Sequence, residues 1–366
     1  MTRRTQLPAD ALVSEVDPPA EQLGSNDAAG AGRRPAPEPV WGIARAVIAG
    51  ATRAATAGGA MVRRRLRAQP TSSPDPVFGI FANGMAYLRM GGGPKTLLWI
   101  PGGPGNTLPT GGLALRMGQS WSRPFADAGY TVWWVTRRQN MPTGHSFADM
   151  ANDYAQVIGE EFGGKVDLVL GMSTGGQIAF YLAAGHPETF QHIIIVAAGY
   201  ADAEHDKDLL LRSARLLSQG RAGEAMALFV DDMYPRVPRP ARRILGEVMG
   251  RSMYGNTHPH FDNDVMVEAE AEAASDAREV LPDITIPVLL VGGDQDPYFP
   301  KEMFQDTAGL IPDCTLRLYE GKGHEGLLSE KRFLQDVLTF IAEHPAAQPE
   351  PATEQPETND QLGAAT

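Results

Sequence analysis

The stretch VDLVLGMSTGGQIAFYLAA, residues 166–184, decides the fold. Its first five residues form an apolar run typical of buried strands, and residues 174–184 fit a helix. Ser173 lies on the turn between them, within Gly-Met-Ser-Thr-Gly, and the flanking glycines allow a tight backbone there. A serine on such a turn exposes its oxygen beside the N–H groups of the helix start. The pattern predicts that Ser173 is a nucleophile and that its neighbour Met172 contacts the substrate.

Strands and helices alternate along most of the chain. Asn83 and Gly84 predict a β-hairpin between residues 77–81 and 85–89. Further strands are expected at residues 96–100, 130–135, 166–170, 193–196, 288–291 and 315–319, and helices at 113–128, 146–162, 174–184 and 329–343. Ser146, with Asp149 three residues later, predicts a capped helix start. The alternation predicts the α/β class, a mostly parallel β-sheet flanked by helices, with ligands bound beyond the carboxyl ends of the strands.

A nucleophilic serine needs a base to take its proton and an acid to orient that base. Two aspartates, Asp294 and Asp296, come directly after the strand expected at 288–291. His324 comes directly after the strand expected at 315–319. Parallel strands bring these loops to the same edge of a sheet, so a Ser173–aspartate–His324 triad is expected there.

In this order of residues the chain resembles the α/β-hydrolase superfamily, over about residues 77–343. Members of that family often carry Gly-x-x-Asp-x-x-x-Pro after the acid strand, and Gly293, Asp296 and Pro300 match this frame. The resemblance therefore implies Asp296 as the acid, with Asp294 as the alternative, and His324 as the base. It implies neither a metal nor a cofactor.

The resemblance also implies an oxyanion hole made by the backbone N–H groups of Thr174 and Gly103. Gly103 lies in Pro-Gly-Gly-Pro-Gly, residues 101–105, where Pro101 replaces the family's usual histidine. A second departure follows the strand at 130–135, where the family's usual acid and first glycine are missing. Arg137 and Arg138 are candidates there, either for binding a substrate carboxylate or for bracing the loop. Tyr298 is a further candidate for contact with the substrate.

Residues 201–283 separate the two parts of the predicted core, 76–200 and 284–344. They contain four helical segments, at 207–218, 222–233, 241–253 and 265–274. The family places a lid here, so the resemblance implies an α-helical cap that shapes the pocket and excludes water. Its apolar side chains either line an adaptable pocket or only pack between helices; they are Met226, Phe229, Met233, Tyr234, Met249, Met253, Tyr254 and Met266.

These residues together predict a serine hydrolase that cleaves an ester, thioester or lactone of a small to medium apolar acid through an acyl-enzyme. Four alternatives stay open on the same scaffold. They are a proline-iminopeptidase-like peptidase, a cofactor-free haloperoxidase or perhydrolase, an acyltransferase, and a ligand-binding member without catalysis.

The ends of the chain differ from this core in composition. Residues 1–39 and the acidic tail, residues 345–366, are rich in alanine, proline and charged residues, which predicts disorder. Residues 40–70 form a basic helix or linker, and the six arginines of 40–67 make contact with a membrane surface an open alternative. The net charge of −12 argues against a nucleic-acid partner, and the single cysteine excludes an intrachain disulfide. Without a secretory signal pattern, a cytoplasmic location is expected.

Overall fold

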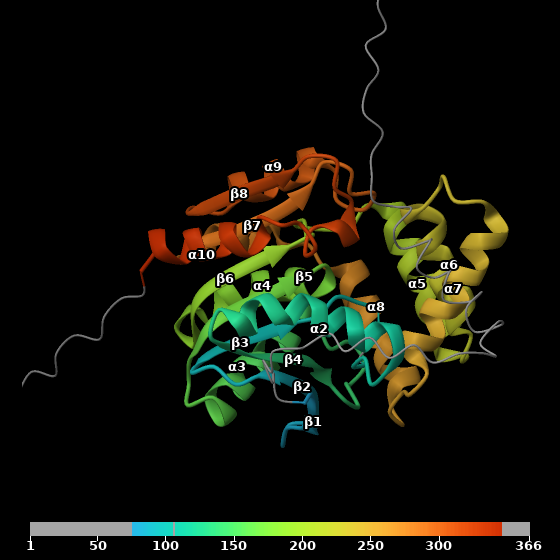
Figure 1. Cartoon of the computed structure of the whole chain (residues 1–366), viewed down its shortest axis with the longest axis horizontal. Coiled ribbons are helices and arrows are strands. Elements are labelled where there is room, and N and C mark those ends of the chain that lie inside the picture. Colours follow the sequence, from blue (N-terminus) through green and yellow to red (C-terminus); the bar gives the residue numbers. More distant parts are fainter. Residues whose placement is uncertain (1–74, 105–106, 346–366) are drawn as a thin grey trace, which may run out of the picture. The chain divides into compact units, whose positions relative to one another are not determined.

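The computed structural model describes residues 75–104 and 107–345. The predictions for residues 1–39 and 40–70, and all but the first residue of the predicted tail 345–366, lie outside these ranges. Within them, strands and helices alternate as the apolar runs of the sequence indicate, and the helices cover a central sheet (Figure 1).

One eight-stranded sheet forms the centre of the described chain. Its strands are β1 (Val77–Ile80), β2 (Met85–Gly91), β3 (Lys95–Ile100), β4 (Tyr130–Arg138), β5 (Val166–Met172), β6 (Phe190–Val196), β7 (Val288–Gly293) and β8 (Cys314–Tyr319). The order is β1-β2-β4-β3-β5-β6-β7-β8, in which β1 and β2 are antiparallel to their neighbours and every later pair is parallel. The mostly parallel sheet and the hairpin at Gly84, whose φ is +87°, are therefore confirmed.

Five helices cover the two faces of the sheet: α2 (Gly112–Asp127), α3 (Phe147–Glu161), α4 (Thr174–Gly185), α9 (Lys301–Leu310) and α10 (Phe333–Glu343). Side chains of a strand alternate between faces, so β3 sends Trp99 toward α2 and α10 and Leu98 toward α3, α4 and α9. The Ser146–Asp149 capping box is present at the start of α3. The sequence did not predict α9, and the last helix starts at Phe333 rather than at Ser329.

Four more helices lie between β6 and β7 in the chain: α5 (Glu204–Ser218), α6 (Ala222–Met233), α7 (Arg239–Tyr254) and α8 (Phe261–Ala274). They have an apolar core of their own around Leu210, Met226 and Val265. Asp264 of α8 accepts the backbone N–H groups of Asn140 and Met141, each at 2.8 Å, which joins α8 to the loop after β4. In Figure 1 these helices stand at the right, where the arrows of the parallel strands point.

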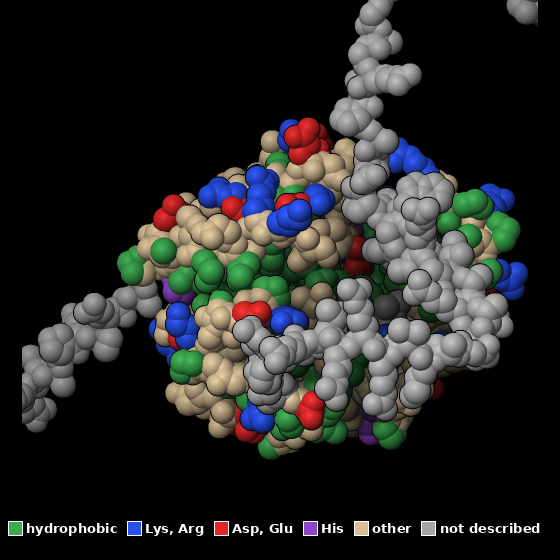
Figure 2. All heavy atoms as spheres, in the orientation of Figure 1, with side chains coloured by type: hydrophobic (Ala, Val, Ile, Leu, Met, Phe, Trp, Pro, Cys, Tyr) green, Lys and Arg blue, Asp and Glu red, His purple; other side chains and the backbone are tan. Residues whose placement is uncertain are grey.

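Four short 3-10 turns complete the described elements, at Pro187–Thr189, Ala277–Glu279, Leu281–Asp283 and His324–Gly326. Basic and acidic side chains are interspersed over the face of the molecule drawn in Figure 2. No helix in residues 75–104 and 107–345 has the length and apolar content needed to cross a bilayer.

Candidate active site

Ser173 occupies the turn between β5 and α4 in a backbone conformation that side chains rarely adopt, with φ +54° and ψ −126°. Its N–H donates to the carbonyl of Val196 at 2.9 Å, and its own carbonyl accepts from the first turn of α4. A Cβ on Gly175 would collide with the carbonyl oxygen of Ile100, and one on Gly171 with that of Gly175. The glycines on both sides of Ser173 are thus required by the close approach of β5, α4 and β3 at this turn.

The structure brings Ser173, His324 and Asp296 together at the carboxyl edge of the sheet. The Nε2 atom of His324 lies 3.0 Å from Ser173 Oγ, and its Nδ1 lies 2.8 Å from Asp296 Oδ2. The other oxygen of Asp296 accepts the backbone N–H groups of Tyr298 and Phe299, at 3.0 and 3.2 Å. The carboxylate is held by its own loop, so it can fix the orientation of the imidazole toward Ser173.

Asp294, the alternative acid, has a different partner. Its Oδ1 accepts the N–H of Gly321 at 2.6 Å, in the loop that precedes His324. It therefore ties the β7 and β8 loops together, whereas Asp296 contacts the imidazole itself.

The surroundings of His324 change the pKa of its imidazole in two opposing ways. Burial favours the neutral ring, but the charge of Asp296 and the hydrogen bond to it favour the protonated ring more, so the pKa is raised above its ordinary value. An imidazole held in this way is suited to accept a proton from Ser173 and to return it to a leaving group.

The loop after β3 is fixed by side chains from three other elements. Arg137 of β4 donates to the carbonyl of Pro101 at 2.6 Å, and Tyr254 of α7 donates to that of Pro104 at 2.5 Å. The N–H of Gly103 donates to the hydroxyl oxygen of Thr174 at 3.0 Å. The predicted oxyanion donor Gly103 is thus next to Thr174, and its N–H is bonded to the threonine side chain in this structure.

Two neighbouring arginines at the end of β4 have different surroundings. The side chain of Arg137 is wholly buried and pairs with wholly buried Glu268 of α8 at 3.0 Å. Its bond to Pro101 braces the loop where the family's histidine is missing. Arg138 pairs with Asp153 of α3 at 3.3 Å and is not among the residues that line the pocket. Arg138 thus joins β4 to α3 in this structure, and its binding of a substrate carboxylate stays a prediction.

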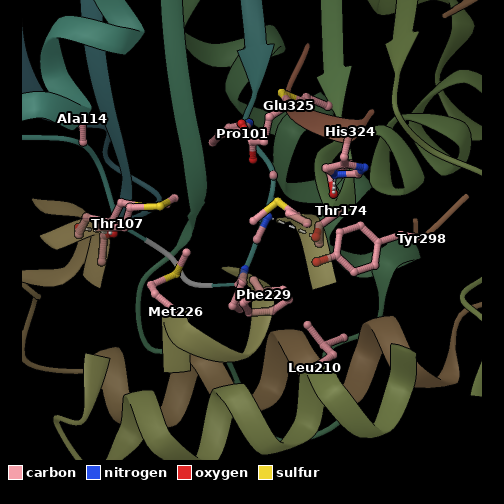
Figure 3. A pocket seen from close by; sticks show the side chains of 18 of the residues that line it. Pro101, Thr107, Ala114, Thr174, Leu210, Met226, Phe229, Tyr298, His324 and Glu325 are labelled. Carbon is pink, nitrogen blue, oxygen red and sulfur yellow. Dashed lines mark hydrogen bonds between the residues drawn. The ribbon is translucent and has the colours of Figure 1, made fainter. Parts of the chain in front are cut away.

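A pocket of about 230 Å³ opens onto Ser173 and His324. Met172 and Tyr298, the predicted substrate contacts, line it, and the ring of Tyr298 meets the imidazole of His324 edge-on with centroids 5.1 Å apart. Figure 3 shows Leu210, Met226 and Phe229 of the inserted helices on one side and Thr174, His324 and Tyr298 on the other. The remaining apolar lining is mainly aromatic and sulfur-containing; it includes Trp99, Met117, Trp121, Trp134, Met233, Met249 and Met253.

Four carboxyl groups that sequence reasoning missed also line the pocket: Asp202, Asp206, Glu272 and Glu325. Burial raises the pKa of Asp202 and that of Asp206 to about 6. Burial, followed by repulsion from Asp202 and Glu268, raises the pKa of Glu272 well above its usual range. In the sequence, Glu272 belongs to an alternating Ala/Glu run that looks like an exposed acidic helix. The only sequence signal is its spacing of three and seven residues from buried Ala269 and Val265, which puts them on one helix face.

These carboxyl groups do not form a metal centre. Among the described residues, no group of three or more His, Cys, Asp or Glu side chains is arranged to hold a metal ion. Glu272 is instead hydrogen-bonded to a protein side chain, since the hydroxyl of Thr174 donates to its Oε1 at 2.8 Å.

Comparison with known proteins places this geometry in a family. The family model described as the alpha/beta hydrolase fold matches residues 95–331. A 2-(acetamidomethylene)succinate hydrolase of Mesorhizobium japonicum is 26% identical over 54% of this chain and 72% of that protein. A pimeloyl-[acyl-carrier protein] methyl ester esterase of Neisseria meningitidis is 24% identical over 54% of this chain and 64% of that protein.

A solved structure agrees in fold. The esterase EaEST from Exiguobacterium antarcticum superposes with a TM-score of 0.56 and 20% identity, covering 72% of this chain and 98% of that one. The family match includes the Ser173 turn and the loops that carry Asp296 and His324. The chain therefore belongs to the alpha/beta hydrolase fold family.

Proposed function

We propose that this protein is a serine hydrolase that cleaves a carboxylic ester, thioester or lactone through an acyl-enzyme on Ser173. The observation that carries the proposal is the hydrogen-bonded series Ser173–His324–Asp296, with contacts of 3.0 and 2.8 Å, at the floor of a largely apolar pocket. A serine hydroxyl in contact with a buried, carboxylate-oriented imidazole is the arrangement that makes it nucleophilic.

In the proposed reaction Ser173 Oγ attacks the substrate carbonyl carbon while its proton passes to His324 Nε2. The resulting oxyanion is stabilised by the N–H groups of Thr174 and Gly103, and the Gly103 N–H exchanges the Thr174 hydroxyl for the oxyanion. His324 then returns the proton to the leaving alcohol or thiol, which leaves an ester on Ser173. Water attacks that ester, gives a proton to His324 and releases the acid, and the proton returns to Ser173.

The lining of the pocket supports an apolar acyl or alcohol group as the part of the substrate that is bound. The stacked rings of Trp99 and Trp134, with centroids 4.7 Å apart, and the neighbouring Trp121 form an aromatic wall. Leu210 and Phe229 of α5 and α6 face the same space, which supports a lid role for α5–α8. The named activities of the two relatives, hydrolysis of a succinate derivative and of a methyl ester, support ester or amide hydrolysis as the reaction class.

Hydrolysis of short and medium-chain esters by the wild-type protein and by Ser173→Ala tests the proposal. We expect saturable hydrolysis by the wild type and a loss of kcat of roughly 10⁴-fold or more in the variant, because a serine nucleophile has no substitute in this mechanism. Asp294→Asn is the matched control for Asp296→Asn, and only the second should approach Ser173→Ala in its effect. A Ser173→Ala protein as active as wild type would refute the acyl-enzyme.

A further inference from the structure

The charged residues that line the pocket are unbalanced. Asp202, Asp206, Glu272 and Glu325 face it, and no lysine or arginine is among its described lining residues. An anionic substrate would be repelled by these carboxyl groups where they are ionised, whereas a cation would favour their ionised form.

Two of the four, Glu272 and Asp206, have buried carboxyl oxygens without a hydrogen-bond partner. Glu272 is only 5% exposed, its Oε1 accepts the hydroxyl of Thr174 at 2.8 Å, and its Oε2 is buried with no hydrogen-bond partner. The nearby guanidinium of Arg137 is engaged by Glu268 and by the carbonyl of Pro101. A buried carboxyl oxygen without a donor is costly, and a hydrogen-bond donor from a ligand would remove that cost.

Asp202 lines the same pocket as Glu272, and its charge helps to raise the pKa of Glu272. Its Oδ1 accepts from Gln177 of α4 at 3.2 Å, on the helix that starts at the Ser173 turn. Asp206, in the first turn of α5, already contacts the exposed His205 at 2.9 Å. Glu272, bonded to Thr174, and Asp202, bonded to Gln177, thus both contact the helix that starts at the Ser173 turn.

We propose that Asp202 and Glu272 form a subsite, beside Ser173, for a positively charged ammonium group carried by the substrate. The inference rests on the proposed hydrolase function and narrows its substrate to an ester or thioester with a protonated amine near the carbonyl. An ammonium group supplies the donor that Glu272 Oε2 lacks, and its positive charge favours the ionised form of the two carboxyl groups, whose pKa values burial raises. The apolar wall then holds the rest of the molecule.

Three methyl esters of equal length test the subsite: methyl β-alaninate (ammonium end), methyl butyrate (methyl end) and monomethyl succinate (carboxylate end), together with their longer homologues. We expect kcat/KM for the ammonium ester of the best length to exceed that of its neutral counterpart by about tenfold or more, with the carboxylate ester slowest. The readout is this ratio, which is independent of overall activity.

Glu272→Gln and Asp202→Asn should each lower the ratio of ammonium to neutral ester toward one. Glu270→Gln, on the same helix but exposed, is the matched control and should leave the ratio unchanged. Equal rates for ammonium and neutral esters at every length, or an unchanged ratio in both subsite variants, would overturn the subsite and leave the hydrolase intact.

Turnover of none of the esters would instead count against the hydrolase. Calorimetry with Ser173→Ala then tests the subsite without catalysis. Tighter binding of methyl β-alaninate than of methyl butyrate would support the subsite, and equal binding of the two would overturn it.

Discussion

The Ser173 turn and helix α8 both form part of the pocket wall, but different factors determine which residues they contain. The turn is made of residues whose identity is forced by backbone geometry: a serine at φ +54° between glycines that tolerate no Cβ. Helix α8 has no such motif, and its contribution is two glutamates buried where an Ala/Glu-rich segment would normally face water. The role of the first region can be predicted from the sequence, whereas the role of the second depends on the residues that surround it in the folded protein.

The two regions are joined by polar contacts rather than by apolar packing alone. Glu268 pairs with Arg137, which braces the proposed oxyanion loop, and Glu272 accepts from Thr174, the residue after the proposed nucleophile. The proposed lid therefore reaches the Ser173 turn through buried polar contacts.

The largest effect is expected from Arg137→Met. Removing the guanidinium leaves Glu268 buried without its cation, which should lower the free energy of unfolding by about 3–5 kcal/mol. Urea unfolding measures this, and the double variant Arg137→Met/Glu268→Gln should recover much of the loss. A single variant as stable as wild type would show that the buried pair does not link α8 to the core.

Thr174→Val should have the next largest effect. It keeps the shape of the side chain but removes the hydroxyl that accepts from Gly103 and donates to Glu272. We expect a loss of about 1–3 kcal/mol in stability and about tenfold in kcat, since two buried groups lose their partner and the oxyanion loop loses its tether. Thr174→Ser should remain close to wild type in both measurements. A valine variant with undiminished kcat would disprove this positioning role.

The pH dependence of kcat/KM tests the pKa of His324. Asp296 stabilises the imidazolium, so the pKa is raised and the neutral base is lost at a higher pH than in free histidine. Activity should therefore fall about tenfold per pH unit on the acid side, with a midpoint above about 6.5. Circular dichroism across the same range separates titration from unfolding. A midpoint below the value of free histidine would contradict the geometry described for the imidazole.

The smallest effect is expected from Arg138→Gln. Arg138 is 38% exposed and its pair with Asp153 lies outside the pocket, so the variant should lose no more than about 1 kcal/mol and keep its kcat/KM within about twofold. Arg137 and Arg138 are adjacent in the sequence but differ in burial, so comparing their variants shows how much of the effect depends on burial. A tenfold loss of kcat/KM would contradict this expectation and would support a substrate-binding role for Arg138.

The sequence was sufficient where chemistry demands a particular residue at a particular turn. Ser173, Asp296 and His324 follow strands in a fixed order, and parallel pairing alone brings their loops to one edge. It was insufficient for Glu272 and could not choose between Arg137 and Arg138, because their roles depend on burial and on partners far away in the chain. Glu272 is 98 residues from Thr174, and Arg137 is 131 residues from Glu268 (268 − 137). The helix propensity and charge pattern of α8 would fit a solvent-exposed helix as well as they fit the partly buried helix that is observed.

Labelling with a fluorophosphonate probe tests the central claim most directly, because the probe reacts with an activated serine and not with an ordinary one. Peptide mass analysis should locate one adduct on Ser173 in the wild type, none in Ser173→Ala, and much slower labelling in His324→Ala. A folded wild-type protein that stays unlabelled, or an adduct that persists in Ser173→Ala, would contradict the account.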